Sequence, residues 1–206
     1  MIKKYFAALS ATALIGVAPY ALAASSTDLT VTGLITPASC TPSLSGGGTI
    51  EYGKISAKDL NLTSSTLLSE EILQLKVDCE ATTPMAFRLI DNNPNSETTW
   101  GMGLGKTPAN ENIGVVHINF SDPVVDGTPV QMSESEDNGQ SWNKVTFIVR
   151  HSLFAPSSLA DPTVTIPSKN YSTDLKILGV INRADSLTLT DEVAINGNAT
   201  IQVEYL

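Results

Sequence analysis

The chain offers few residues of the types that carry out acid–base, nucleophilic or metal chemistry. Its 206 residues include two histidines, His117 and His151, and two cysteines, Cys40 and Cys79. His151 precedes Ser152, but neighbouring residues of an extended strand point to opposite faces and cannot easily cooperate in nucleophilic catalysis. The chain also has no G-x-S-x-G nucleophile elbow. We therefore expect no catalytic residues, no metal and no cofactor, and a protein that is not an enzyme.

Two loops resemble binding motifs but lack what those motifs require. Asp91–Glu97 places oxygen ligands at the first, third and fifth positions of a calcium loop, but it has no glycine at the sixth position and no carboxylate at the twelfth. Ser135–Trp142 matches the pattern S-x-D-x-G-x-x-W of sialidase-type propellers, in which it forms a hairpin turn. A propeller needs several copies of that pattern. One copy predicts a turn.

Charge and the first residues indicate an exported protein. The net charge is −9, which argues against a partner that presents phosphates, such as nucleic acid or an anionic membrane. Lys3 and Lys4 precede a short apolar stretch, Tyr5–Val17, which is followed by the cleavage pattern Ala21-Leu22-Ala23. We read residues 1–23 as a signal peptide, with a membrane anchor as the alternative. Because removal of the two lysines changes the charge to −11, the exported chain is more acidic still.

Export makes the cysteines informative. Cys40 and Cys79 are the only two, and an oxidising compartment favours a disulfide between them. On the chain-entropy model, such a loop contributes about 4 kcal/mol to stability. The alternatives are two free thiols or half of a metal site.

The apolar residues of the chain recur at every second position, as they do in β-strands. Apolar residues alternate with polar ones in short segments separated by Gly-, Pro- and Asn-rich turns, which predicts an all-β sandwich or barrel in a single domain, residues 24–206. Leu60–Gln74 fits a short helix, but its Ser/Thr run favours a loop. Ser121–Asn143 reads as an inserted acidic loop. The expected strands are Leu29–Ile35, Thr49–Ile55, Ile72–Val77, Met85–Ile90, Ile113–Phe120, Val145–Leu153, Leu175–Ile181 and Ala194–Leu206.

The last strand has the clearest pattern. Its apolar face consists of Ala199, Ile201, Val203 and Tyr205, and its polar face of Thr200, Gln202 and Glu204. A terminal strand with a clean apolar face either pairs inside a sheet, as the final strand of an ordinary sandwich, or presents a free edge.

Four features together resemble the pilin-like subunits of the chaperone–usher system of Gram-negative bacteria, and in particular an uncharacterised branch of fimbrial-like periplasmic proteins. They are an alternating segment with one glycine before Cys40, the spacing of the two cysteines, two internal strand motifs, and a final strand with a penultimate aromatic. The sequences concerned are Leu29–Ile35, Cys40 to Cys79, Ile113–Ile118 with Phe147–His151, and Gly197–Leu206.

The resemblance implies an immunoglobulin-like, pilin-type sandwich that lacks its final strand and works by strand exchange. It implies a donor strand in residues 24–36 with Leu29, Val31, Gly33 and Ile35, and a C-terminal acceptor strand with Ala199, Ile201, Val203, Tyr205 and Leu206. The implied partners are a periplasmic pilus chaperone, an outer-membrane usher and other fimbrial subunits. The implied location is the periplasm and then the fimbrium or cell surface, without direct membrane insertion.

A second hypothesis keeps the sandwich complete in itself. Trp100 and Trp142 lie in polar loops, where exposed aromatic rings could stack on sugars, although packing within the loops is the alternative. The chain would then be a self-complete carbohydrate-binding or adhesin-like module.

Overall fold

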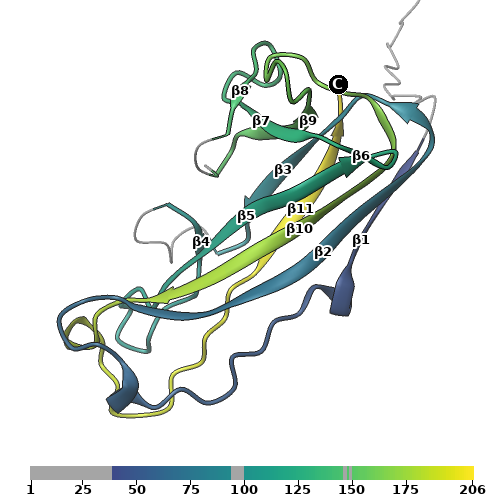
Figure 1. Cartoon of the computed structure of the whole chain (residues 1–206). Coiled ribbons are helices and arrows are strands. Elements are labelled where there is room, and N and C mark those ends of the chain that lie inside the picture. The colour runs from purple at the N-terminus through teal and green to yellow at the C-terminus, as the bar shows by residue number, and fades with distance from the viewer. Residues whose placement is uncertain (1–38, 94–99, 146–147, 149) are drawn as a thin grey trace, which may run out of the picture. The chain divides into compact units, whose positions relative to one another are not determined.

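The computed structural model of the chain describes residues 39–93, 100–145, 148 and 150–206, which consist of strands, irregular segments and three short 3-10 helices (Figure 1). No helix in these ranges has the length and apolar character needed to cross a bilayer. The strands are β1 (Cys40–Leu44), β2 (Thr66–Thr83), β3 (Met85–Asp91), β4 (Met102–Gly103), β5 (Gly114–Val125), β6 (Thr128–Pro129), β7 (Gln131–Ser135), β8 (Asn143–Lys144), β9 (Leu153–Ser157), β10 (Ser168–Ile181) and β11 (Ala199–Tyr205). The helices are η1 (Ser45–Gly48), η2 (Ala57–Asp59) and η3 (Ala184–Ser186).

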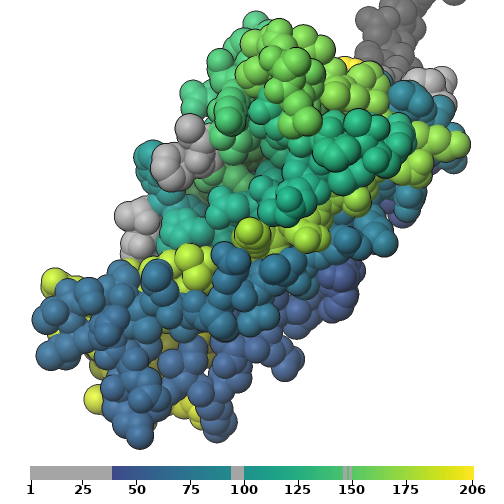
Figure 2. All heavy atoms as spheres, viewed as in Figure 1, coloured from purple at the N-terminus to yellow at the C-terminus, as the bar shows by residue number. Residues whose placement is uncertain are grey.

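The strands form two antiparallel sheets, as the alternating pattern predicts. One sheet has the order β1-β2-β10-β5-β4, with β6 also paired to β5, and the other has the order β11-β3-β9-β7-β8. Side chains of β2, β10 and β5 cover the outer face of the first sheet, which faces the viewer in Figure 2. The expected all-β sandwich is therefore confirmed.

The core lies between the two sheets and is built from the inward positions of both. Along β10, buried residues alternate with less buried ones from Tyr171 to Ile181, as a strand with one core face requires. Phe87 of β3 is fully buried, and its ring centroid lies 4.9 Å from that of Tyr171. The ring centroid of Phe120 in β5 lies 5.6 Å from that of Phe154 in β9. These aromatic pairs join strands of the two sheets, so the sandwich is closed by direct packing.

Two expected loops are strands. Leu60–Gln74 is expected to be a loop or a short helix. Residues 60–65, which include the Ser/Thr run, are irregular, but β2 starts at Thr66 and pairs with β10 over most of its length. Further along β2, Leu73 and Leu75 supply the apolar face of the strand. Likewise, the expected insert Ser121–Asn143 contains the end of β5 and all of β7. Glu134 lies in β7 beside the buried Ser133 and Ser135, whereas Asp126, Glu136 and Asp137 lie in the turns between the strands, so the segment is strands joined by acidic turns.

Two expected strands are largely irregular. Thr49–Ile55 has no regular structure, because Gly46, Gly47 and Gly48 adopt positive φ values of 59°, 66° and 74° and turn the chain away from the sheet after β1. Of the described residues in Val145–Leu153, only Leu153 belongs to a strand. His151 has a φ of 75° there, which an extended strand cannot accommodate.

The predicted signal peptide, residues 1–23, and the candidate donor strand, residues 24–36, lie outside the described residues. The described residues belong to one compact unit.

Candidate functional site

The C-terminal strand lies at a free edge. β11 pairs with β3 over its whole length, from Ala199 opposite Asp91 to Tyr205 opposite Met85, and no other described strand pairs with it. β1 is the edge of the other sheet and pairs with β2 alone among the described strands. The two edges meet at one end, where the N–H of Cys40 donates a hydrogen bond of 2.9 Å to the hydroxyl of Tyr205. Each edge strand presents unpaired backbone groups that can template another strand.

An apolar groove lies between these edges, away from the contact of Tyr205 with Cys40. Its first part is a cavity of about 250 Å³. Leu44, Ile50 and Tyr52 lie on the β1 side, and residues 195–199 and Ile201 lie on the β11 side. Its floor consists of core side chains of the first sheet, namely Leu73, Val116, Ile118, Leu175 and Ile177.

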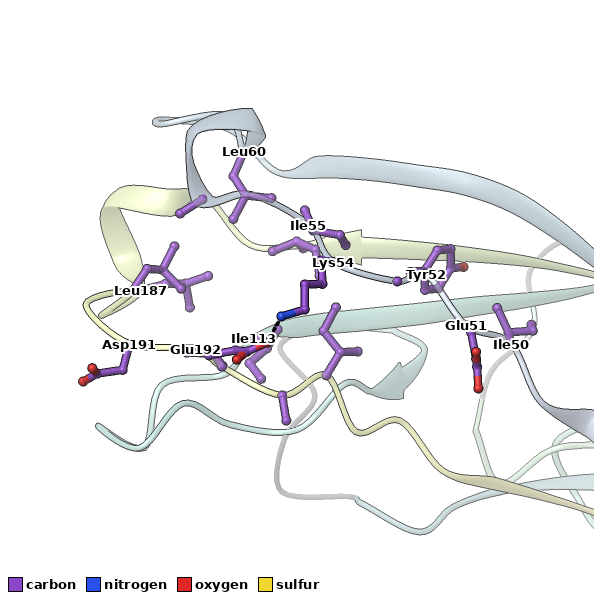
Figure 3. A pocket seen from close by; sticks show the side chains of 17 residues that line it. Ile50, Glu51, Tyr52, Lys54, Ile55, Leu60, Ile113, Leu187, Asp191 and Glu192 are labelled. Carbon is purple, nitrogen blue, oxygen red and sulfur yellow. Dashed lines mark ion pairs between the residues drawn. The ribbon is translucent and has the colours of Figure 1, made fainter.

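The groove continues into a larger cavity of about 840 Å³, which we call the distal cavity (Figure 3). Ile50, Tyr52 and Ile195 line both cavities, so the groove is continuous. Its walls are two irregular segments, residues 49–55 after β1 and residues 189–195 before β11. Other aliphatic residues that line the distal cavity are Leu60, Ile113, Ile181, Leu187 and Val193.

The backbone of both walls is unpaired. Within the described part of the chain, no backbone hydrogen bond joins residues 49–55 or residues 189–195 to another segment. Backbone N–H and C=O groups are obligatory hydrogen-bonding groups, and in a folded protein they bind either water or another chain segment. Two unpaired walls along an apolar floor therefore have the properties of a slot for an additional β-strand.

Tyr52 holds the first wall against the sheet. Its ring lies over Gly179 of β10, and a Cβ at that glycine would lie 3.2 Å from the Tyr52 hydroxyl and 2.9 Å from Cδ1 of Leu68. Burial raises the pKa of Tyr52 above its usual value of 10. Gly179 thus provides the room that lets the wall approach β10.

Only some residues of the predicted acceptor strand line the groove. Ala199 and Ile201 line the groove. Val203 is half-buried and packs against the main core, whereas Tyr205 closes the end of the groove through its contact with Cys40. Leu206 is 45% exposed and donates its backbone N–H to the carbonyl of Pro84 at 3.2 Å. The predicted donor residues Leu29, Val31, Gly33 and Ile35 lie outside the described residues.

The two cysteines form the expected disulfide. Cys40 and Cys79 stand opposite each other in the register of β1 and β2, and the bond joins them. It fixes the start of β1 at the closed end of the groove. The disulfide therefore holds in place the backbone N–H that Tyr205 contacts.

The two tryptophans differ, and for Trp142 the structure contradicts a glycan contact and shows the alternative of packing within the protein. Trp142 is only 8% exposed and packs against Ala86, Leu153 and Ala155, so its ring has no open face for a sugar. The turn that precedes it explains this burial, because it folds the indole beneath itself. Trp100 is 61% exposed, as a sugar-stacking residue would need to be.

The turn before Trp142 is held by Asp137, as its sequence pattern predicts. The Asp137 carboxylate accepts hydrogen bonds from the hydroxyl and N–H of Ser141, at 2.6 and 2.9 Å, and from the hydroxyl of Ser135 at 2.7 Å. These donors lower the pKa of Asp137 from its usual 3.8 to about 2. Gly139, at a φ of 88°, completes the turn. The pattern is therefore a structural hairpin.

The second loop with a binding-like pattern is also structural where it is described. The Asp91 carboxylate accepts the N–H of Asn93 at 2.8 Å and that of Gly103 at 2.9 Å. Over the described ranges, His, Cys, Asp and Glu side chains nowhere gather in a group of three that could hold a metal ion.

Sequence reasoning did not identify the groove walls or the network that holds β11. Ile50 and Tyr52 alternate within the expected strand Thr49–Ile55, and this alternation is the only local signal that their side chains face one side. Glu204 forms an ion pair with Arg88, which also donates to the His151 carbonyl at 2.6 Å. The hydrogen bond to Glu204 raises the pKa of Arg88. The pair fixes β11 to β3 from the outer face, away from the groove.

Comparison with known proteins adds relatives without an assigned activity. Residues 29–100 match the family described as protein of unknown function (DUF1120). The chain is 26% identical to protein GltF of Escherichia coli K12, over 90% of this chain and 91% of GltF. It is 24% identical to the uncharacterized protein YhcF of the same strain, over 88% and 90% of the two chains. The chain is thus similar, over nearly its full length, to proteins that represent an uncharacterised group.

Proposed function

We propose that this chain is a non-catalytic, fimbrial or pilus-like structural subunit that is assembled by donor-strand exchange and contributes to surface fibres and adhesion. In this proposal a strand from another protein enters the groove and pairs with the edge of β11 and with the two walls. The observation that carries the proposal is the groove itself, which combines an apolar floor with unpaired backbone on both sides. Backbone pairing would supply affinity, and the side-chain pockets would set the register.

The amino-terminal segment has the pattern that such a groove accepts. Leu29, Val31 and Ile35 would bury their side chains on one face, and Gly33 would allow the backbone to approach closely. Burying three such side chains contributes about 5–9 kcal/mol before the cost of ordering the strand. A periplasmic chaperone, an outer-membrane usher and other subunits are the proposed partners, and the fimbrium or cell surface, reached through the periplasm, is the proposed location.

A peptide-binding experiment tests this function. Residues 24–206 are produced without a chaperone, and a synthetic peptide of residues 24–36 is added. We expect weak folding alone and a rise in the thermal midpoint that grows with peptide concentration, because ligand binding stabilises the folded state by mass action. The matched control is a peptide with serine at positions 29, 31 and 35. A stable monomer that ignores the first peptide, and that tolerates deletion of residues 24–35, would contradict the proposal.

A self-complete carbohydrate-binding module is the second candidate, and the exposure of Trp100 favours it. Trp142 is excluded from that role by its burial. The test is glycan-array binding by the wild-type chain and by Trp100→Ala. Binding that disappears in the variant would support this candidate, and an array without signal would reject it.

A further inference from the structure

We propose that the distal cavity takes a β-strand from a partner protein that carries Lys or Arg beside its aliphatic side chains, in preference to residues 24–36 of a second copy of this chain. This inference rests on the proposed function and specifies the partner. It follows from the charges around the cavity and from those of the chain's own candidate donor.

The rim of the distal cavity is acidic. Its charged lining residues are Glu51, Asp191, Glu192 and Lys54. Lys54 Nζ lies 3.3 Å from Glu192 Oε1, so this cation is already compensated within the chain. Glu51 and Asp191 have no ion-pair partner among the described residues, and they lie toward opposite ends of the cavity (Figure 3). An entering strand therefore meets two uncompensated carboxylates along an apolar floor.

The Lys54–Glu192 pair shows where a partner's cation would be accommodated. Lys54 belongs to the first wall and Glu192 to the second, so the pair spans the cavity (Figure 3). Both side chains are largely exposed, at 90% and 82%, and an exposed ion pair of this kind holds the walls together only weakly. A strand that separates the walls breaks the pair and leaves Glu192 available. A basic side chain on that strand would replace Lys54.

The chain's own candidate donor strand is acidic, like the rim of the cavity. Residues 24–36 contain one charged side chain, Asp28, and neither Lys nor Arg. A second copy would bring this carboxylate to a rim that already carries uncompensated acids. Like charges within a Debye length repel each other, and such repulsion is a common means of rejecting the wrong partner. Charge complementarity thus favours a basic strand from a different protein.

The experiment compares three peptides on the chain of residues 24–206. They are residues 24–36 with the natural sequence, the same peptide with Asp28→Lys, and a peptide with Asp28→Asn and Thr36→Lys, which places the cation at the other end. Dissociation constants are measured by fluorescence anisotropy at 20 mM and 500 mM NaCl. We expect at least one lysine peptide to bind about 5-fold more tightly than the natural peptide at 20 mM NaCl. At 500 mM NaCl the difference in affinity should fall below about 2-fold, because salt screens exposed charges.

Substitutions at the rim of the distal cavity test whether the preference for the lysine peptides arises there. Glu51→Gln/Asp191→Asn should remove most of the low-salt preference. Lys54→Ala should increase it, because Glu192 is then uncompensated. Glu70→Gln/Asp78→Asn removes the same charge from exposed positions of β2 that do not line the cavity, and it should leave the preference unchanged.

The outcomes separate this inference from the proposed function. Equal affinity for the three peptides at low salt, or tighter binding of the natural peptide, overturns the basic-partner inference while strand exchange stands. A preference that survives in Glu51→Gln/Asp191→Asn also overturns it. If no peptide binds, both the proposed function and this inference fail.

Discussion

The hydroxyl of Tyr205 accepts the backbone N–H of Cys40 across 165 residues of sequence, at 2.9 Å. This bond joins the edge of one sheet to the edge of the other and closes one end of the groove. The cavities lie away from this bond, beside Leu44 and Ile201. In the proposed strand exchange, the Tyr205–Cys40 contact would mark one end of the added strand.

Tyr205→Phe tests this closure. The substitution removes the acceptor and leaves the Cys40 N–H to water, so we expect a loss of about 0.5–1.5 kcal/mol in the free energy of unfolding, toward the lower value because the site is partly exposed. Urea unfolding measures the loss. Gln202→Ala, at an exposed position of the same strand, is the matched control. Equal unfolding midpoints for Tyr205→Phe and Gln202→Ala would show that the bond contributes nothing.

Ile195→Asp tests the groove. Ile195 lines both cavities, and a carboxylate there would have to be desolvated by an added strand, so we expect at least about a 10-fold loss in affinity for the peptide of residues 24–36. Stability should change little, because Ile195 is 37% exposed. Leu159→Asp changes another exposed aliphatic residue that lines neither cavity and should keep full affinity. Retained binding in Ile195→Asp would place the peptide elsewhere.

Asp137→Asn tests the turn beneath which Trp142 packs. The pKa of Asp137 is lowered in the folded state from 3.8 to about 2, so its ionised form stabilises the fold above about pH 4, and this contribution is lost as the pH falls toward 2. The wild-type chain should therefore be more stable than the variant at pH 6, and the difference should shrink between pH 4 and pH 2. Urea midpoints across this range measure it, with Asp78→Asn as a control for the loss of one carboxylate. A constant difference from pH 6 to pH 2 would contradict the assignment.

Trp142→Ala and Trp100→Ala distinguish a structural from an exposed tryptophan. Trp142 packs on Ala86, Leu153 and Ala155, and its truncation should cost about 3–5 kcal/mol of stability. Trp100 is 61% exposed, and its truncation should cost less than about 1 kcal/mol. Thermal or urea unfolding of the two variants measures the difference. Similar losses in both would refute the burial of Trp142.

Several elements could be predicted because their determinants are local. The second half of β10, Leu175–Ile181, and β11 follow from alternation, since a strand with one buried face must place every second side chain in the core. The Asp137 turn follows from residues within a few positions of one another. The disulfide follows from the presence of only two cysteines in a chain with a predicted export signal.

The sequence by itself determined that this protein is an all-β sandwich with one disulfide and an alternating C-terminal strand. Only the tertiary structure decided that residues 49–55 leave the sheet, that Trp142 rather than Trp100 is the buried tryptophan, and which residues line the groove beside Ile201. The alternation of apolar and polar residues predicts which side chains share a face of a strand. It does not predict which other strand, if any, packs against that face. Strand pairing and cavities depend on contacts between segments far apart in the chain, and those contacts exist only after folding.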